Sequence, residues 1–217
     1  MPLNIDKCQV LTFSRKKDPL TYAYELSSRV LTRVISKKDL GVIFDSRLVF
    51  DLHIQRVVSS SLRMLGFIIR NTGGFTSIET VKTLYCAYVR SHLEYAAIAW
   101  NPYYEVYKTE LERVQRRFLK YLYFKKYGLY PVRGYDQALL LREFDLRSLE
   151  HRRTLAIVTF LYKLCNGISD CPELSSMLDL HEQRESARVM RVFDCPRART
   201  NLMFKSPLYG MTSTFNF

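Results

Sequence analysis

The first fifty residues alternate apolar and polar positions in short runs, a pattern typical of β-strands. Four runs are predicted as strands: residues 8–14, 20–26, 28–35 and 40–44. Ser27-Ser28 and residues 36–39 are predicted turns between them. The pattern therefore predicts a small N-terminal antiparallel β portion. If residues 8–14 have no further strand beside them, we expect this segment either to lack order or to pair only with the 28–44 strands.

After Phe50 the apolar spacing changes to that of amphipathic helices. A first helix is predicted over residues 51–70 from its apolar positions, which are Ile54, Val57, Val58, Leu62, Leu65, Ile68 and Ile69. Residues 71–74 (NTGG) end this helix, and Ser77 or Thr76 caps a second helix that runs to about Leu93. Asn101-Pro102 ends that segment.

Residues 108–126 have the clearest amphipathic pattern in the chain. Their apolar stripe consists of Leu111, Val114, Phe118 and Leu122. Their cationic stripe consists of Arg113, Arg116, Arg117 and Lys120. At about 100° per residue the two stripes point in nearly opposite directions, so one face can join a core while the other meets solvent.

Two more helices and an irregular tail are predicted after this one. The helices cover residues 135–142 and 147–165, and the second is expected to turn inward Leu155, Val158, Leu161, Tyr162 and Cys165. Beyond Asn166, scattered Gly and Pro residues predict loops with one helical piece. The expected organisation is a β portion at 1–50, a helical domain at 51–165 and an irregular tail at 166–217, so the fold is mainly α.

The charge of the chain is concentrated rather than spread evenly. The 217 residues carry 33 Lys+Arg against 21 Asp+Glu, a formal net charge of +12. Residues 108–163 alone carry thirteen basic and six acidic residues. A localised positive field attracts polyanions, of which nucleic acid is the commonest inside cells, although a basic surface that only aids solubility gives the same composition.

Composition also bears on compartment. Hydrophobic residues make up 47% of the chain, which excludes a disordered polypeptide. The longest apolar segment, residues 84–100, contains charged residues, so we expect no membrane span and no membrane partner. The N-terminus lacks the pattern of a signal peptide, and five scattered Cys favour a reducing intracellular compartment, cytoplasm or nucleus.

The residues that would carry metal or nucleophilic chemistry are dispersed. No two Asp residues are adjacent, so local spacing assembles no two-metal site. The four His lie far apart, none pairs with Cys at zinc-finger spacing, and no glycine-rich phosphate loop is present. We therefore predict no catalytic residue, no metal ligand and no cofactor in this chain.

The cationic stripe is the strongest candidate site. A solvated helix face usually mixes both signs of charge, whereas cations one turn apart, about 5 Å, can follow a phosphate backbone. Arg90 and Lys125 are weaker candidates for the same role. An aromatic cluster comprises Tyr95, Trp100, Tyr103 and Tyr104. These rings could stack bases, but a hydrophobic plug where a helix meets its loop is the favoured interpretation.

Several collinear motifs resemble the end of the palm and the thumb of non-LTR (LINE, jockey-like) retrotransposon reverse transcriptases. The first is residues 3–15, LNIDKCQVLTFSR. The second is residues 39–50, DLGVIFDSRLVF, followed by His53-Ile54. Further matches are residues 65–68 (LGFI) with Arg70, Leu84-Tyr85, residues 89–91 (VRS), 93–96 (LEYA), 100–102 (WNP) and 112–118 (ERVQRRF), and in the tail Arg197, Arg199 and Ser206-Pro207. Together they cover nearly the whole chain.

The resemblance implies part of an RNA-directed DNA polymerase, namely the palm end and a helical thumb-like bundle. The family's aromatic-x-Asp-Asp catalytic turn would lie before Met1, and Met1-Pro2 stands where the family has Gly, so we expect a truncated copy without activity of its own. Magnesium belongs to the intact family enzyme. The implied partner is an RNA–DNA hybrid or duplex backbone. Lys7 matches a palm lysine linked to proton transfer, but without metal-binding carboxylates it would be only a residue of a strand-leading loop.

Two other interpretations remain open. The chain could be a non-enzymatic basic helical module that binds nucleic acid or protein, the acidic stretch 170–182 and the aromatic cluster then serving a protein partner that the sequence does not identify. It could also be a relic without function.

Overall fold

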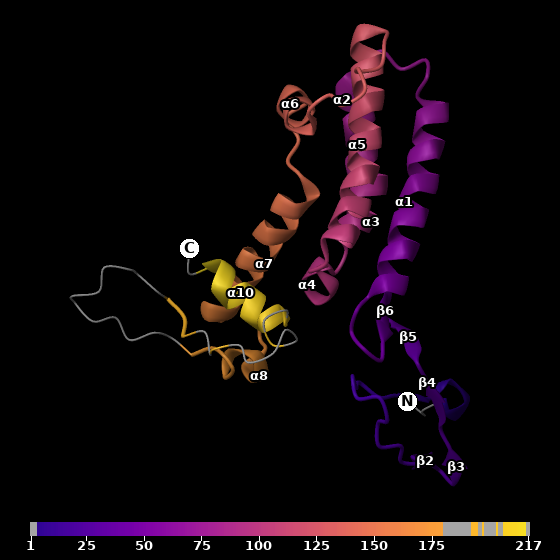
Figure 1. The fold of residues 1–217 in the computed structure, drawn as a ribbon, viewed down its shortest axis with the longest axis vertical. Helices are drawn as coiled ribbons and strands as arrows, with labels where there is room; N and C mark the ends of the chain where they lie inside the picture. Colours follow the sequence, from indigo (N-terminus) through magenta and orange to yellow (C-terminus); the bar gives the residue numbers. More distant parts are fainter. Residues whose placement is uncertain (1–3, 180–191, 195–196, 198–202, 204–205, 216–217) are drawn as a thin grey trace, which may run out of the picture. The chain divides into compact units, whose positions relative to one another are not determined.

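The computed structural model describes residues 4–179, 192–194, 197, 203 and 206–215, and the fold is mainly helical with a few small sheets (Figure 1). The chain divides into two compact units, residues 1–60 and 61–217. No helix in the described ranges combines the length and the apolarity needed to cross a bilayer.

The first unit holds short strand ladders. Strand β1 (Gln9–Leu11) pairs in parallel with β4 (Thr32–Val34). Strands β2 (Glu25–Leu26) and β3 (Arg29–Val30) form an antiparallel hairpin, as do β5 (Ser36–Asp39) and β6 (Val42–Asp45). A 3₁₀ turn, η1 (Ile5–Lys7), precedes β1. Residues 8–14 thus pair with the 28–44 segment, one of the two expected alternatives.

Several predictions for this unit were wrong, among them the strand expected over 20–26, of which only Glu25–Leu26 is a strand. The β portion is not wholly antiparallel, because the twenty residues between β1 and β4 are long enough to return the chain in the same direction. Residues 36–39 form strand β5 and not a turn. The turn is Leu40-Gly41 instead, with φ of 42° and 92°, the backbone of a two-residue hairpin loop that fixes the pairing. Three of the four β5 residues are exposed, which explains their polar sequence.

Asp45 organises the connection from β6 to the first long helix. Its carboxylate accepts hydrogen bonds from the backbone N–H groups of Arg47 at 2.9 Å, Val49 at 2.9 Å and Phe50 at 2.7 Å. Helix α1 (Asp51–Asn71) begins directly after this turn. A carboxylate with several N–H donors stabilises a turn more strongly than a neutral acceptor, so the start of α1 is defined by side-chain chemistry.

His53, in the first turn of α1, is buried within the first unit. Its Nδ1 accepts the backbone N–H of Ile43 at 3.3 Å, which ties α1 to β6. Burial, and secondarily the positive charge of Arg56, lowers the pKa of His53 below its ordinary value. The neutral ring is therefore the form that the fold stabilises.

In the second unit, the stretch after α1 is one bent helical run. It consists of α2 (Ile78–Tyr85), the π-helical segment η2 (Cys86–Arg90) and α3 (Ser91–Glu94). The predicted cap is confirmed, because the Ser77 hydroxyl accepts the N–H of Thr80 at 3.2 Å. Ala96 adopts a left-handed φ of 51°, after which α4 (Ala97–Trp100) starts in a new direction.

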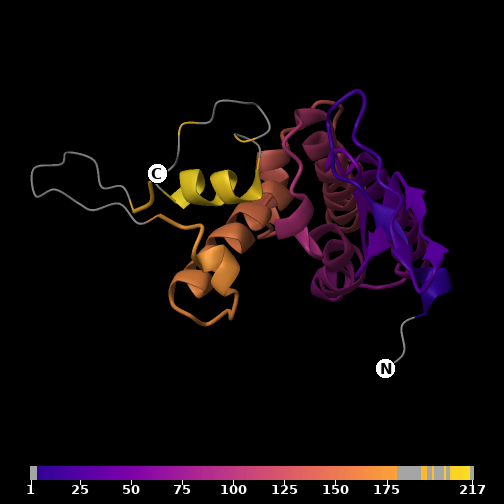
Figure 2. The ribbon, with the colours of Figure 1, turned by 90° about the horizontal axis from the view of Figure 1, so that it is seen from below.

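The remaining helices follow the predicted order. Helix α5 (Glu105–Tyr127) ends at Gly128, whose φ of 74° allows its N–H to bond the Phe124 carbonyl. Asp136 caps α6 (Gln137–Glu143) and Ser148 caps α7 (Leu149–Cys165). In the tail, α8 (Pro172–Ser175) and α10 (Pro207–Phe215) are helical, and α10 lies beside α7 (Figure 2). Most of the tail between α8 and α10 lies outside the described residues.

The core of the second unit forms around α5. All four positions of its predicted apolar stripe, Leu111, Val114, Phe118 and Leu122, are buried. The ring of Phe118 stacks on Tyr85 of α2, with centroids 3.8 Å apart and an interplanar angle of 5°. Helix α7 also contacts α5, and its Leu161 packs with Phe193 and Met211 in a second buried cluster.

The predicted inner face of α7 was wrong in part. Leu155, Tyr162 and Cys165 are exposed, and the buried face runs instead through Leu149 and Arg153 to Leu161 and Leu164. The spacing of apolar residues does not predict this face, because a charged residue, Arg153, occupies its centre.

Arg153 is a charged residue buried in the middle of this face. Its side chain is 2% exposed, and in the described part of the chain none of its three guanidinium nitrogens has a hydrogen-bond partner. Burial lowers its pKa despite the acidic side chains of Glu112, Glu150 and Glu94 nearby. A buried cation without direct partners destabilises a fold.

We expect Arg153→Met to stabilise the protein. Met has a similar length and needs no hydrogen bonds, and replacing buried ionic groups by apolar ones has stabilised other proteins by about 1–4 kcal/mol. Urea unfolding followed by circular dichroism would measure the change, with the exposed Arg142→Met as control. A loss of stability in Arg153→Met alone would mean that the guanidinium has a favourable partner.

We expect the stability of the first unit to decrease as pH falls below about 6.5, the ordinary pKa of His. Because the folded pKa is lowered, the unfolded chain binds the extra proton first as pH falls, so the free energy of unfolding rises with pH up to about 6.5 and levels off above it. Unfolding measured between pH 5 and 7.5 would test this. In the variant His53→Gln the free energy of unfolding should depend less on pH. An unchanged pH dependence would show that His53 is not its source.

Candidate nucleic-acid interface

The cationic face of α5 comprises Arg113, Arg116, Arg117 and Lys120. The three arginines are exposed and Lys120 is half-buried, opposite the buried stripe of the same helix. None of the four is turned into the core. The helical period that buries one stripe therefore holds the other at the surface.

Three acidic side chains near this face are engaged elsewhere. Glu112 accepts the backbone N–H of Glu150 at 2.8 Å and the Gln137 amide N–H at 3.2 Å. Glu105 and Glu150 both pair with Lys108, at 2.8 and 2.9 Å. These three carboxylates thus neutralise another lysine or cap a helix, whereas Glu110 lies one turn before Arg113 on the same helix.

One member of the face is held in place. The Nε of Arg116 donates to the side-chain oxygen of Gln137 at 2.7 Å, and Gln137 donates in turn to Glu112. Arg113, Arg117 and Lys120 form no hydrogen bond or ion pair with any residue that the structure describes. Gln137 was not identified from the sequence, because it reaches α5 from a separate helix and carries no periodic signal.

Hollows flank the cationic face on two sides. One, of about 240 Å³, is lined by Leu62 of α1 and all four cations. The other, of about 520 Å³, shares Arg113, Arg116 and Lys120 but also includes Glu105, Glu112 and Glu150. The two surroundings therefore differ in charge, since the described lining of the first contains no acidic residue.

The other predicted cations make intramolecular contacts. Arg90 lies 3.8 Å from Glu94, which also accepts two hydrogen bonds from Arg152. The ammonium group of Lys125 donates to the backbone carbonyls of Thr72 and Gly73 at 2.9 Å each, and to that of Phe75. Lys7, in the first unit, is exposed in η1.

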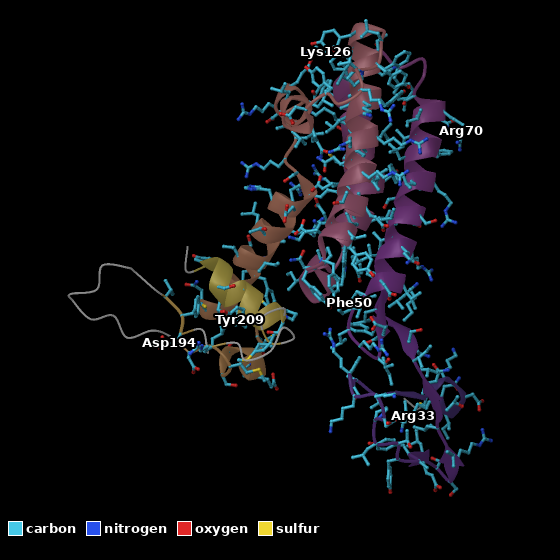
Figure 3. All side chains as sticks on the ribbon, in the orientation of Figure 1. Arg33, Phe50, Arg70, Lys126, Asp194 and Tyr209 are labelled. Carbon is cyan, nitrogen blue, oxygen red and sulfur yellow. The ribbon has the colours of Figure 1, made fainter. Side chains whose placement is uncertain are left out.

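The end of α5 is joined to the end of α1 by a second contact. The hydroxyls of Tyr121 and Thr72 are 2.8 Å apart and both are buried. At the last turn of α5, Lys126 (labelled in Figure 3) pairs with Glu143 of α6 at 2.9 Å. A hydrogen bond from Tyr127, together with Lys126, lowers the pKa of Glu143. These contacts fix α5 at its C-terminal end.

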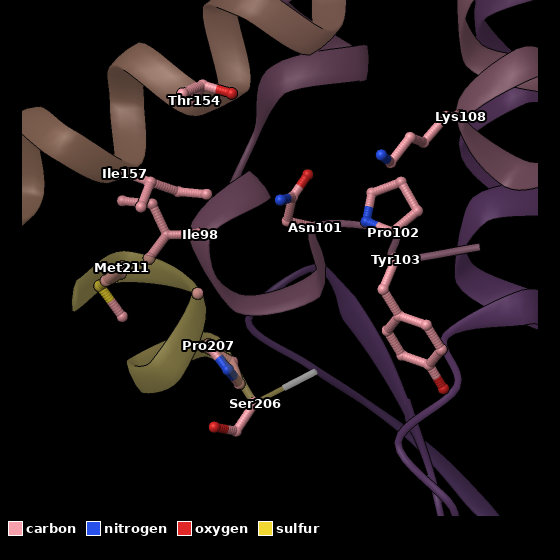
Figure 4. Close-up of a pocket in the computed structure, with 11 residues that line it drawn as sticks. Ile98, Asn101, Pro102, Tyr103, Lys108, Thr154, Ile157, Ser206, Pro207 and Met211 are labelled. Atoms are coloured by element: carbon pink, nitrogen blue, oxygen red, sulfur yellow. The ribbon is translucent and has the colours of Figure 1, made fainter. Parts of the chain in front are cut away.

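The aromatic cluster divides into a buried and an exposed part. Trp100 is 1% exposed and its indole N–H bonds the Tyr95 carbonyl at 2.8 Å, as expected of a hydrophobic plug. Tyr95 and Tyr104 are exposed. A cavity of about 270 Å³ beside the plug is lined by side chains of α4, α7 and α10 and by Tyr103 (Figure 4).

We expect Lys125→Met to lower the free energy of unfolding by about 1–3 kcal/mol, because carbonyls at the end of α1 lose their donor. We expect the affinity for nucleic acid to change little. Lys163→Met is a matched control, since Lys163 is exposed and lies on α7. Calorimetric melting and a binding titration would measure both quantities. Unchanged stability with weakened binding would instead make Lys125 a ligand contact.

Among the residues that the structure describes, no three His, Cys, Asp or Glu side chains gather as possible metal ligands. No family model, curated protein or solved structure matches the chain.

Proposed function

We propose that this chain is the C-terminal part of a non-LTR retrotransposon reverse transcriptase, comprising the end of the palm and the thumb. We propose further that its helical unit holds the template–primer duplex, an RNA–DNA hybrid, by its phosphate backbone. The collinear motifs support the first proposal. The cationic face of α5 supports the second.

The proposal that the helical unit holds a duplex rests on one observation, a row of exposed cations without acidic partners. Arg113, Arg116 and Arg117 lie within two helical turns, and Arg113 and Arg117 are unpaired in the part of the chain that the structure describes. Guanidinium groups bind phosphate oxygens through two parallel hydrogen bonds. A surface of this kind recognises the backbone and its shape, and not the identity of the bases.

Nucleic-acid binding of this kind is driven by the release of counterions. Four neutralised phosphates predict a slope of log K against log salt of roughly −3 to −4. Arg90 and Lys125 would add to this slope only if they leave their present partners. The buried stripe of α5 makes no contribution, because its side chains are enclosed in the core.

The chain itself is proposed to lack polymerase activity. Its 217 residues contain no adjacent Asp pair, and in the intact family enzyme magnesium is held by such carboxylates. DNA synthesis by the purified chain with primer, template and magnesium would contradict the proposal.

We expect the triple variant Arg113→Gln, Arg116→Gln, Arg117→Gln to reduce the magnitude of the salt slope by about 2–3, because three phosphate contacts are lost. Titration of a labelled RNA–DNA hybrid at several salt concentrations measures the slope. The matched control replaces Arg133, Arg142 and Lys163 by Gln, which removes the same charge from exposed positions off the face.

Two results would overturn the site or the function. Equal salt slopes for the triple variant and its control would remove the α5 face from the binding surface. No hybrid binding by the unmodified chain would favour the alternatives, a helical module for a protein partner or a relic.

A further inference from the structure

The cavity between α4, α7 and α10 combines an apolar side with a polar side. Its volume is about 270 Å³, and its apolar lining includes Ile98, Pro102, Ile157, Pro207 and Met211. Its polar lining includes Asn101, Lys108 and Thr154. Figure 4 shows the side-chain amide of Asn101 between the two isoleucines and the ammonium end of Lys108. Polar groups of the side chains, and not only their stems, therefore face this cavity.

The amide of Asn101 is held in place but has no partner in the described part of the chain. Asn101 is exposed, and its side chain forms no hydrogen bond with any residue that the structure describes. Its neighbours Trp100 and Pro102 are both buried, so the backbone on either side of it is packed. An amide presents N–H donors and a carbonyl acceptor in one plane. It is suited to a planar ligand that carries a donor and an acceptor side by side.

The charges around Lys108 favour an uncharged ligand. Its ammonium group lies 2.8 Å from the carboxylate of Glu105 and 2.9 Å from that of Glu150. An anionic ligand beside Lys108 would be repelled by both carboxylates, whereas a cationic ligand would meet the ammonium group that lines the cavity. Lys108 has three N–H groups, so one remains for an acceptor on a neutral ligand.

The size and the apolar side of the cavity favour a flat ring system. Pockets that enclose drug-sized molecules have volumes of about 300–1,000 Å³, so a cavity of about 270 Å³ is too small for a whole nucleotide. A nucleobase is uncharged, carries donors and acceptors along its edge, and has apolar faces that stack on side chains. The amide of a peptide side chain would satisfy Asn101 but would leave the apolar side unfilled.

The cavity adjoins the surface that we propose for the phosphate backbone. Lys108 lines both the cavity and the larger hollow beside the cationic face, which also includes Arg113, Arg116 and Lys120. Lys108 and Arg113 are five residues apart on α5, which is about 7.5 Å along the helix axis. A strand whose phosphates lie on the cationic face can therefore place a base in the cavity.

We propose that the cavity between α4, α7 and α10 binds one unpaired nucleobase, with Asn101 paired to its edge and Ile98, Ile157 and Met211 around its ring. The inference rests on the proposed function in taking nucleic acid as the partner. It adds a single-stranded nucleotide, which recognition of a duplex backbone does not need.

The first test compares small uncharged ligands on the full chain. Adenosine and cytidine are titrated by calorimetry at pH 7.5, with ribose as the control that lacks a base. We expect saturable binding of at least one nucleoside and none of ribose. N-acetylglutamine amide is the probe for a protein partner. Binding of this amide as tightly as the nucleosides, or no nucleoside binding, would overturn the proposal.

The second test locates the site with variants. Asn101→Leu should weaken nucleoside binding about tenfold, equivalent to ~1.4 kcal/mol, because a good bidentate pair with a base is worth about 1–3 kcal/mol. Asn71→Leu, at an exposed position at the end of α1, is the matched control and should bind as the unmodified chain does. Unchanged affinity in Asn101→Leu would remove Asn101 from the site.

Gly210 offers a variant that fills the cavity without a clash. It lines the cavity, and a Cβ added to it would have no neighbouring atom within 4 Å. Because Leu forms helices more readily than Gly, Gly210→Leu should keep α10 folded and abolish nucleoside binding. Gly210→Ala adds only a methyl group and should retain most of the affinity. Circular dichroism identifies any variant that fails to fold, and nucleoside binding by folded Gly210→Leu would overturn the assignment.

The third test separates this inference from the proposed function. RNA–DNA hybrids with a short single-stranded overhang of adenosines are compared with hybrids whose overhang has the same length but lacks bases. We expect the first to bind at least fivefold more tightly, and Gly210→Leu to remove this difference. Hybrid binding without a preference for the overhang with bases would overturn this inference alone. Nucleoside binding without hybrid binding would overturn only the proposed function.

Discussion

Burial of the apolar stripe of α5 is the interaction on which the second unit depends. Phe118 stacks on Tyr85, and Leu111, Val114 and Leu122 are enclosed with it. A helix has one rotation about its axis at which this stripe is buried. Because the cations lie on the other side of the same helix, core packing also determines which charges reach solvent.

Charge pairing then decides which cations remain available. Glu105 and Glu150 are occupied by Lys108, and Glu112 holds the start of α7 and the side chain of Gln137. Apart from the Lys108–Glu105 pair within α5, these contacts join elements distant in sequence. The cationic face is thus unpaired through the arrangement of its acidic neighbours, and not because the sequence lacks them.

Helix positions could be predicted from the sequence because they depend on local periodicity and capping. The apolar stripe of α5 and the Ser77 cap were confirmed, and so was exposure of the three arginines. Pairing between distant segments could not be predicted. Strand β5 consists of polar residues, three of the four exposed, so it lacks the alternating pattern of a strand, and the buried face of α7 contains Arg153, so it lacks a continuous apolar stripe. The contacts of Gln137 and Lys125 likewise exist only once separate helices meet.

Lys125, near the end of α5, fixes the end of α1 against α5. Lys125 donates hydrogen bonds to the carbonyls of Thr72 and Gly73, which follow α1. One turn earlier on α5, the hydroxyl of Tyr121 is hydrogen-bonded to that of Thr72. These contacts hold the two helices together just beyond Lys120. The spacing between the two helix backbones is therefore set at that end by contacts that use none of the four cations of the α5 face.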